Sequence, residues 1–346
     1  MTEILALLQI INQSVLDATT RRRLAIIILA MLAMAGHITM RGISRWTEEG
    51  GSYRTIQRLF NMKIDWSQLM VTFVAIWFAD VEDIFLLVGD ETVVTKAGKQ
   101  THGLDRFFSS IFGRPVKGLA FLAFSLVSVK RREAYPIRME QLSKEKALCG
   151  KRKKQGAKRK YGSKLDDNQI PDAYLVSTET VDKIRTHIYQ MQMWHKLFPD
   201  KLNIVIVRKV NLENGKRAHV VLFSSDLTLA ADKLVDYYRL RFQIEFNFRD
   251  AKQFWGLEDF MNVKQQPVHN FANLSMFMVT VAQQLMQQRR DAIPNFGVND
   301  LKAEFPGRKY VSELLKLLPE TLNELLFDGF FAKVGVLGRI NAPLPP

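Results

Sequence analysis

The sequence predicts a mixed α/β protein, in which a strand-rich middle region lies between helical regions at both ends. Apolar runs such as IFLLVGD (84–90) and LNIVIVRKV (202–210) have the length and composition of buried strands. The stretch NLENGK (211–216) has the residues of a hairpin turn and would join the second strand to AHVVLFSSD (218–226). Strands followed by a helix that starts near Leu229 indicate an α/β or α+β core.

The composition indicates a globular protein with a polyanionic partner. The chain has 346 residues, enough for two or three domains, and a net charge of +14. Such a charge is typical of proteins that bind nucleic acid or an anionic membrane face. The single cysteine, Cys149, excludes a disulfide framework and a multi-cysteine zinc site, and the six histidines lack metal-ligand spacing. We therefore expect a reduced, cytosolic protein.

The stretch RRRLAIIILAMLAMAG (21–36) resembles a signal peptide or a membrane anchor. Its uncharged part runs only from Leu24 to Gly36, whereas a spanning helix needs about 20 residues. We expect a buried core helix here and no insertion into a membrane.

The first 75 residues are expected to form a helical, DNA-binding region. The expected helices are Thr2–Ala18, Arg22–Ala35, a short helix from a Thr39 cap to Trp46, and Tyr53–Phe60 with Ser52 as its cap. A short helix, a glycine-containing turn and an arginine-bearing helix outline a helix-turn-helix. Arg54, Gln57 and Arg58 are the candidate DNA contacts. The alternative is a plain helical bundle with a solvated basic face.

The middle region contains two further candidate strands and a basic run. The strands are GLAFLAFSLVSV (118–129) and EAYPIRMEQL (133–142), where Pro136 restricts the strand to an edge or a bulge. The run from residue 143 to 164 has ten Lys or Arg residues against Glu145 alone. Such a segment is a solvated linker or a grip on the DNA backbone.

The stretch YYRLRFQIEFNFRDAK (237–252) is expected to lie within one buried helix. On a helical wheel Tyr238, Arg241, Glu245, Arg249 and Lys252 share one narrow stripe, and apolar residues cover most of the rest. Buried charges are costly unless they are paired or used. The stripe is therefore a ladder of salt bridges, or it faces a cleft that binds a charged ligand.

Asp90 at a strand end and Glu245 on this helix are candidate ligands of a divalent metal ion. Two carboxylates from different elements of a basic protein are suited to Mg²⁺-assisted phosphoryl transfer. Arg241 and Lys252 would hold phosphates, and Tyr238 would bond to or stack on the DNA strand. The alternative for Asp90 is an ordinary loop or capping residue.

The pattern Tyr238-x₂-Arg241-x₃-Glu245-x₆-Lys252 resembles the Tyr-Arg-Glu-Lys signature of bacterial insertion-sequence transposases of the IS-four type. GDETVVTKAGKQTHGLDRFFSS resembles the segment that bears the first catalytic Asp of this family, here Asp90. FQIEFNFRDAKQFWGLEDF resembles the helix that bears the catalytic Glu, and HITMRGISRW with GSYRTIQRLF resembles the DNA-binding region. The resemblance extends from about Ile26 to Gln284.

This resemblance implies an RNase H-like catalytic core of the DDE type at residues 80–260, between the DNA-binding region (1–75) and a helical C-terminal region (261–346). It implies binding of terminal inverted repeats, Mg²⁺- or Mn²⁺-dependent strand cleavage and transfer, and a homodimer on paired ends. Asp90 and Glu245 would hold the metal, while Tyr238, Arg241 and Lys252 would position double-stranded DNA. The expected location is the bacterial cytoplasm, at the nucleoid when DNA is bound.

One part of the family pattern is missing. YPIRMEQLSKEKALCG passes almost directly into KRKKQGAKRKYGSKLDD, without the helix and the apolar strand that would end in the second catalytic Asp. We infer an internal deletion with its break near Lys144–Lys151. A first alternative to an active transposase is therefore an inactive, truncated chain that only binds DNA. A second is a stand-alone metal nuclease.

Overall fold

The computed structural model describes residues 2–47, 51–109, 112–143, 170–194, 198–316, 329–331, 333–335 and 337. The chain divides into two compact units. The first comprises Met1–Glu145 and Gln243–Pro346, and the second comprises Lys146–Phe242. Each unit is described by itself below. The first unit takes residues from all three predicted domains, whose limits stay a prediction.

The first unit begins with five helices. They are α1 (Thr2–Gln9), α2 (Ala18–Ala33), α3 (Met40–Trp46), α4 (Tyr53–Asn61) and α5 (Trp66–Trp77). The predicted caps of the two short helices are confirmed, because Thr39 Oγ1 accepts the Gly42 N–H and Ser52 Oγ accepts the Thr55 N–H. The predicted first helix was too long: α1 ends at Gln9, and α2 begins after Asp17.

The apolar run within α2 forms a buried helix, as predicted. Its residues from Leu24 to Ile28 are all buried in the first unit. Among the described residues, none of the helices combines the length and the hydropathy that crossing a bilayer would require.

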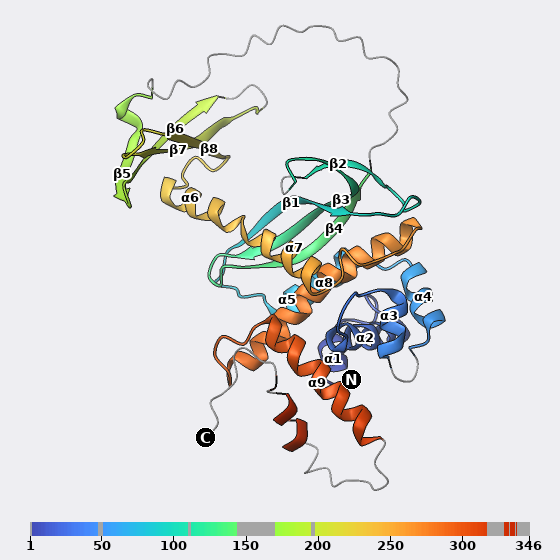
Figure 1. Cartoon of the computed structure of the whole chain (residues 1–346). Helices are drawn as coiled ribbons and strands as arrows, with labels where there is room; N and C mark the ends of the chain where they lie inside the picture. Colours follow the sequence, from blue (N-terminus) through green and yellow to red (C-terminus); the bar gives the residue numbers. More distant parts are fainter. Residues whose placement is uncertain are drawn as a thin grey trace, which may run out of the picture. The chain divides into compact units, whose positions relative to one another are not determined.

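The first unit contains a four-stranded antiparallel sheet (Figure 1). Its strands are β1 (Phe85–Thr95), β2 (Asp105–Ser109), β3 (Arg114–Ser128) and β4 (Glu133–Leu142). The long strand β3 pairs with the other three. Pro136 lies beside the register shift in β4, which among the described strands pairs with β3 alone, so its predicted place at an edge or bulge is confirmed.

Strand β1 pairs on one side only within the described part of the chain. The Val129 N–H bonds to Ile84 O, and the Lys96 N–H bonds to Lys117 O, so the even-numbered residues of β1 face β3. In an antiparallel pair the intervening residues direct their N–H and C=O groups the other way. The backbone groups of the odd-numbered residues, Val93 among them, therefore point to the outer edge.

The first unit also contains three helices from the C-terminal half of the chain. They are α7 (Gln243–Gln253), α8 (Gln265–Arg290) and α9 (Val298–Leu315). Helix α7 packs against β1, β3 and β4 (Figure 1). Helix α8 is buried along most of its length, and its Asn270 holds α4 by donating to the carbonyls of Phe60 and Met62, both at 2.8 Å.

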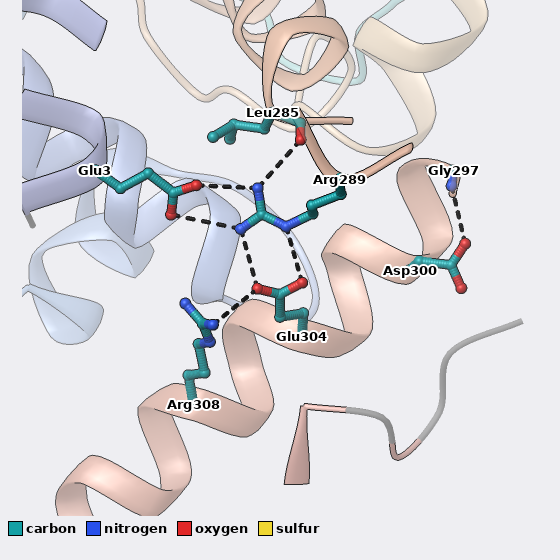
Figure 2. A network of polar contacts seen from close by, with 7 residues as sticks. All are labelled: Glu3, Leu285, Arg289, Gly297, Asp300, Glu304 and Arg308. Carbon is teal, nitrogen blue, oxygen red and sulfur yellow. Dashed lines mark hydrogen bonds and ion pairs between the residues drawn. The ribbon is translucent and has the colours of Figure 1, made fainter. Parts of the chain in front are cut away.

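Figure 2 shows the polar network that joins α1, α8 and α9. The guanidinium of Arg289 donates two bonds of 3.0 Å to the Glu304 carboxylate and one of 3.0 Å to Glu3. It also donates to the Leu285 carbonyl at 3.1 Å, and Arg308 lies 3.4 Å from Glu304. Because the Glu304 side chain is only 2 % exposed, this carboxylate depends on its cationic partners.

The second unit is a four-stranded antiparallel sheet with one covering helix. Its elements are the 3₁₀ helix η1 (Asp172–Tyr174), β5 (Leu175–Val181), β6 (Ile184–Trp194), β7 (Lys201–Asn211), β8 (Arg217–Ser224) and α6 (Ala231–Leu240). The strands pair in sequence order. The predicted hairpin is confirmed, since β7 and β8 are antiparallel neighbours joined through residues 212–216. Strands β2, β5 and β6 were not predicted.

Candidate active site

Strand β1 places Asp90 on the face of the sheet that α7 covers. Val88, Thr92 and Val94 share this face and are buried, whereas Asp90 is half-buried and Glu91, on the opposite face, is exposed. The predicted strand end at Asp90 is wrong, because β1 continues to Thr95. The TVVT residues after Asp90 favour strand and complete the pairing with β3.

Two hydrogen bonds attach α7 to the sheet on either side of Asp90. Asn247 Nδ2 donates to Ser125 Oγ at 3.1 Å, and Ser125 pairs with Val88, two residues before Asp90. Lys252 Nζ donates to the carbonyl of Val93, three residues after Asp90, at 3.1 Å. The helix is therefore held along the stretch of β1 that contains Asp90.

Glu245 lies in the first turn of α7 and is exposed. It is seven residues from Lys252, so the two side chains project within about 20° of each other on the helix. Since Lys252 reaches the outer edge of β1, Glu245 projects toward the same side of the helix. Asp90 and Glu245 are thus carried by two elements that are attached to each other.

Lys252 has a structural role in addition to the predicted one. Its side chain is only 18 % exposed, and its ammonium group lies 3.7 Å from Glu258 as well as bonding to Val93. These contacts fix the C-terminal half of α7 against the edge of β1. The predicted contact of Lys252 with DNA stays a prediction.

The stretch 237–252 forms two helices, so the predicted single buried helix is wrong. Helix α6 ends at Leu240, and the N–H groups of Arg241 and Phe242 close a tight turn before α7 begins at Gln243. The break places Arg241 outside the helix that carries Glu245 and Arg249, and Arg249 pairs with Asp250 at 2.8 Å. Phe242 and Phe246 are 51 % and 39 % exposed, so the apolar side chains of this stretch are not all buried, as was expected for one buried helix.

Tyr238 and Arg241 belong to the second unit. The Tyr238 ring is 45 % exposed and lies 5.7 Å from the Arg241 guanidinium. An exposed ring beside a guanidinium is suited to contact with a nucleic acid strand.

The chemistry of Asp90 and Glu245 is suited to one hard divalent cation. Mg²⁺ prefers oxygen ligands and often binds through one or two carboxylates, with waters and substrate phosphates completing its shell. Within the described ranges, no group of three His, Cys, Asp or Glu side chains could hold a metal ion.

Helix α4 presents the three residues that were predicted to contact DNA. Arg54, Gln57 and Arg58 are exposed on one side of the helix, while Ile56, Leu59 and Phe60 are buried on the other. The structure thus leaves the basic side of α4 accessible.

Sequence reasoning missed the polar residues that hold these elements in place. Asn247 lies on the buried side of α7, where an apolar residue would be expected, and Asn270 is fully buried in α8. A polar residue within an otherwise apolar helix face was the available signal, because such a residue needs a buried partner.

Two family models match the sequence. One, described as DDE superfamily endonuclease, matches residues 10–169, and the other, described as transposase DDE domain, matches residues 126–281. A comparison with curated proteins finds no match. The two models support a DDE transposase and DNA transposition as the class of function. Families of this class bind DNA, generally use divalent metal ions, and imply metal-dependent DNA cleavage.

Proposed function

We propose that this chain is a DDE-type insertion-sequence transposase of the IS-four type, with an RNase H-like core. It binds the terminal inverted repeats of its element, and then cleaves and transfers DNA strands with a divalent metal ion. The attachment of α7 to β1 through Lys252 and to the neighbouring strand β3 through Asn247 carries this proposal, because it holds the Glu-bearing helix against the Asp-bearing strand. The two family models support the same class of function.

In this proposal Asp90 and Glu245 are the metal ligands. Mg²⁺ or Mn²⁺ would supply Lewis-acid activation of a water or a 3′-hydroxyl and stabilise the leaving oxygen. Lys252 keeps α7 against β1 through its bond to Val93, so it holds the two ligands in place and contacts DNA from the same helix. Tyr238 and Arg241 hold the DNA strand at the cut ends.

Residues 1–75 act as the DNA-binding region in this proposal. Arg54, Gln57 and Arg58 are exposed on α4, so they can reach phosphates or base edges of double-stranded DNA. The partners are the element ends and a target duplex, and two copies of the chain assemble on paired ends. The basic run 143–164, which lies outside the described residues from 144 onward, would add sequence-independent affinity.

A second candidate function is a truncated transposase that binds DNA without cutting it. Within the described residues β1 has no partner on its outer edge, where a fourth strand with a second Asp would pair in an RNase H-like core. The proposed deletion near Lys144–Lys151 lies outside the described residues. Loss of one of three metal carboxylates would weaken metal binding and catalysis.

An end-joining experiment separates these functions. Full-length protein is incubated with labelled pre-cut terminal DNA, a target plasmid and Mg²⁺ or Mn²⁺. The variants are Asp90→Asn, Glu245→Gln and, as matched control, Glu91→Gln, which alters an exposed carboxylate on the opposite face of β1.

Joined product that disappears in Asp90→Asn and Glu245→Gln but persists in Glu91→Gln is the expected result. Cleavage without joining would indicate a nuclease. A DNA complex without any cleavage or joining would indicate the DNA-binding remnant. Joining that survives in both Asp90→Asn and Glu245→Gln would overturn the assignment of the site.

A further inference from the structure

The turn that follows α7 closes the helix tightly. Gly256 has a φ of +75°, and the Leu257 N–H donates to the Ala251 carbonyl at 2.9 Å, which ends the helix. The Asp259 N–H then donates to the Gly256 carbonyl at 3.0 Å. We name residues 256–260 the junction turn. Because two backbone hydrogen bonds define its path, the junction turn is fixed to the end of α7.

Strand β1 is attached to the junction turn from one side. Lys96, the residue after β1, donates to the carbonyls of Glu258 and Phe260 at 2.8 and 2.9 Å. Its ammonium group also lies 3.7 Å from the centre of the Phe260 ring. Burial lowers the pKa of Lys96 to about 8, so the group is still charged near pH 7 and forms charge-assisted hydrogen bonds. The junction turn is therefore held at the end of the strand that carries Asp90.

The chain that enters the helices proposed to bind DNA is attached to the same turn. The Asp259 carboxylate accepts the Ile38 N–H at 2.8 Å, and its other oxygen lies 2.7 Å from His37 Nδ1. Ile38 precedes Thr39, which caps α3. The two segments are in direct contact, because a Cβ at Gly256 would lie 2.6 Å from the Ile38 Cβ. These contacts fix the point at which α3 begins.

Three consecutive residues of the junction turn connect the two proposed sites. The carbonyls of Glu258 and Phe260 bond to the β1 side, and the Asp259 side chain between them bonds to the start of α3. Helix α3 packs against α4, whose C-terminal end is held by Asn270. The place of the α3–α4 pair is thus set at two points, of which Asp259 is the one next to α7 and β1.

The carboxylate of Asp259 forms two contacts of different kinds. Its side chain is 19 % exposed, but the side chain of its partner His37 is 88 % exposed. An ion pair this open to solvent contributes only modestly to stability. The hydrogen bond to the Ile38 N–H is directional and needs no charge on His37. The contact with the backbone is therefore the one suited to holding α3 in a defined place.

We propose that Asp259 is a positioning residue, which sets the DNA-binding helices relative to the metal ligands and thereby determines which phosphodiester bond is cut. This proposal rests on the proposed function, because it requires DNA on α4 and a metal ion at Asp90 and Glu245. Successive phosphates of one strand advance by about 3.4 Å along a duplex. A displacement of α3 by that distance would therefore move the cut by one nucleotide.

Mapping of the cuts at nucleotide resolution tests the proposal. Full-length protein is incubated with Mg²⁺ and an end-labelled duplex that contains an uncut terminal repeat. Asp259→Ala removes both contacts, whereas Asp259→Asn keeps an oxygen that accepts the Ile38 N–H. Asp80→Ala is the matched control, because Asp80 likewise accepts one backbone N–H, that of Glu82 at 3.0 Å, and one ammonium group, that of Lys130 at 2.9 Å.

The expected result is a change in the position of the cuts. Wild-type protein, Asp259→Asn and Asp80→Ala should cut mainly at one bond. Asp259→Ala should also cut at neighbouring bonds, and its rate at the wild-type bond should fall by about 10- to 100-fold, because a small misplacement of the reacting groups is costly. Its affinity for the terminal duplex should be unchanged, since the basic side of α4 is intact. A purely structural role would weaken all cuts equally and move none.

Iron-directed cleavage of the bound DNA gives a second readout that needs no hydrolysis. Fe²⁺ in place of Mg²⁺, with ascorbate and peroxide, produces hydroxyl radicals, whose cuts mark the part of the duplex next to the metal ion. These cuts should be displaced or spread in Asp259→Ala and stay in place in Asp259→Asn. Lys96→Met breaks the attachment on the β1 side and should displace the cuts as well, so it serves as the test if Asp259→Ala fails to fold.

Cuts of folded Asp259→Ala that match those of the wild type in position and relative intensity would overturn the proposal. A displacement of equal size in Asp80→Ala would also overturn it, because the effect would then not depend on the junction turn. Either result leaves the proposed function intact. Wild-type protein that binds no terminal duplex, or whose bound duplex shows no radical cuts, would refute the proposed function and this proposal with it.

Discussion

Replacement of Arg289 by Met should destabilise the first unit more than any other single change in its polar network. The substitution keeps an apolar side chain of similar length, but removes both 3.0 Å bonds to Glu304 and the bonds to Glu3. Glu304 remains almost fully buried, with Arg308 at 3.4 Å as its remaining partner in Figure 2. A buried carboxylate that loses its main cation carries the full cost of its desolvation.

The size of the effect follows from this burial. Removing one partner of a buried ion pair costs about 3–5 kcal/mol, whereas an exposed pair contributes about 0–1 kcal/mol. At about 2–4 °C per kcal/mol for a unit of this size, Arg289→Met should lower Tm by roughly 6–20 °C. Arg308→Met should lower it far less, because Arg308 is 47 % exposed.

Thermal melting followed by far-ultraviolet circular dichroism measures these shifts. A double variant, Arg289→Met/Glu304→Gln, removes the buried charge together with its partner and should recover part of the lost stability. A Tm for Arg289→Met within 2 °C of the wild type would refute this reasoning. Recovery that fails in the double variant would show that lost packing, not an unpaired charge, causes the destabilisation.

Three further predictions concern the candidate site and its supports. Lys252→Met should lower the free energy of unfolding in urea by about 1–2 kcal/mol, since the partly exposed, charged hydrogen bond to Val93 is lost. Unchanged stability together with a lower salt slope of DNA binding would show instead that Lys252 only contacts DNA. Asn270→Leu should lower the free energy of unfolding, measured in the same way, by at least about 2 kcal/mol, because the carbonyls of Phe60 and Met62 lose their hydrogen-bond donor. An unchanged free energy of unfolding would contradict this. The pKa of His37 lies above 6.5, because the ring forms a hydrogen bond with Asp259 and is attracted to its charge. The stabilisation of the fold by protonated His37 is therefore fully present below pH 6.5, and it is lost as the pH rises through the raised pKa. His37→Gln should therefore destabilise the protein at pH 5.5 and have little effect at pH 8.5, and a pH-independent difference would contradict this.

Local signals in the sequence predicted the helix starts in the N-terminal region. Thr39 and Ser52 were identified as caps because a side-chain oxygen next to the first turn satisfies the free N–H groups of the same helix. The hairpin between β7 and β8 was predicted for a similar reason, since the turn residues at 211–216 suffice to specify it. These features depend on neighbours in the sequence.

The features that were wrong or missing depend on distant contacts. The break at Arg241 leaves the helical period of 237–252 unchanged, so a helical wheel cannot reveal it. Strands β5 and β6 alternate polar and apolar residues only weakly, and their pairing with β7 determines them. The bond of Lys252 to Val93 joins residues far apart in the sequence, and no local pattern predicts it.

Iron-directed cleavage of the protein backbone would show whether Asp90 and Glu245 hold one metal ion. Fe²⁺ replaces Mg²⁺, and ascorbate with peroxide then produces hydroxyl radicals that cut the chain close to the ion. We predict cuts in β1 near Asp90 and in α7 near Glu245. Mg²⁺ should suppress both cuts, and each of the variants Asp90→Asn and Glu245→Gln should abolish both. The control variant Glu91→Gln should retain both cuts. Cuts near only one of the two residues, or cuts in α7 that persist in Asp90→Asn, would contradict a shared metal site.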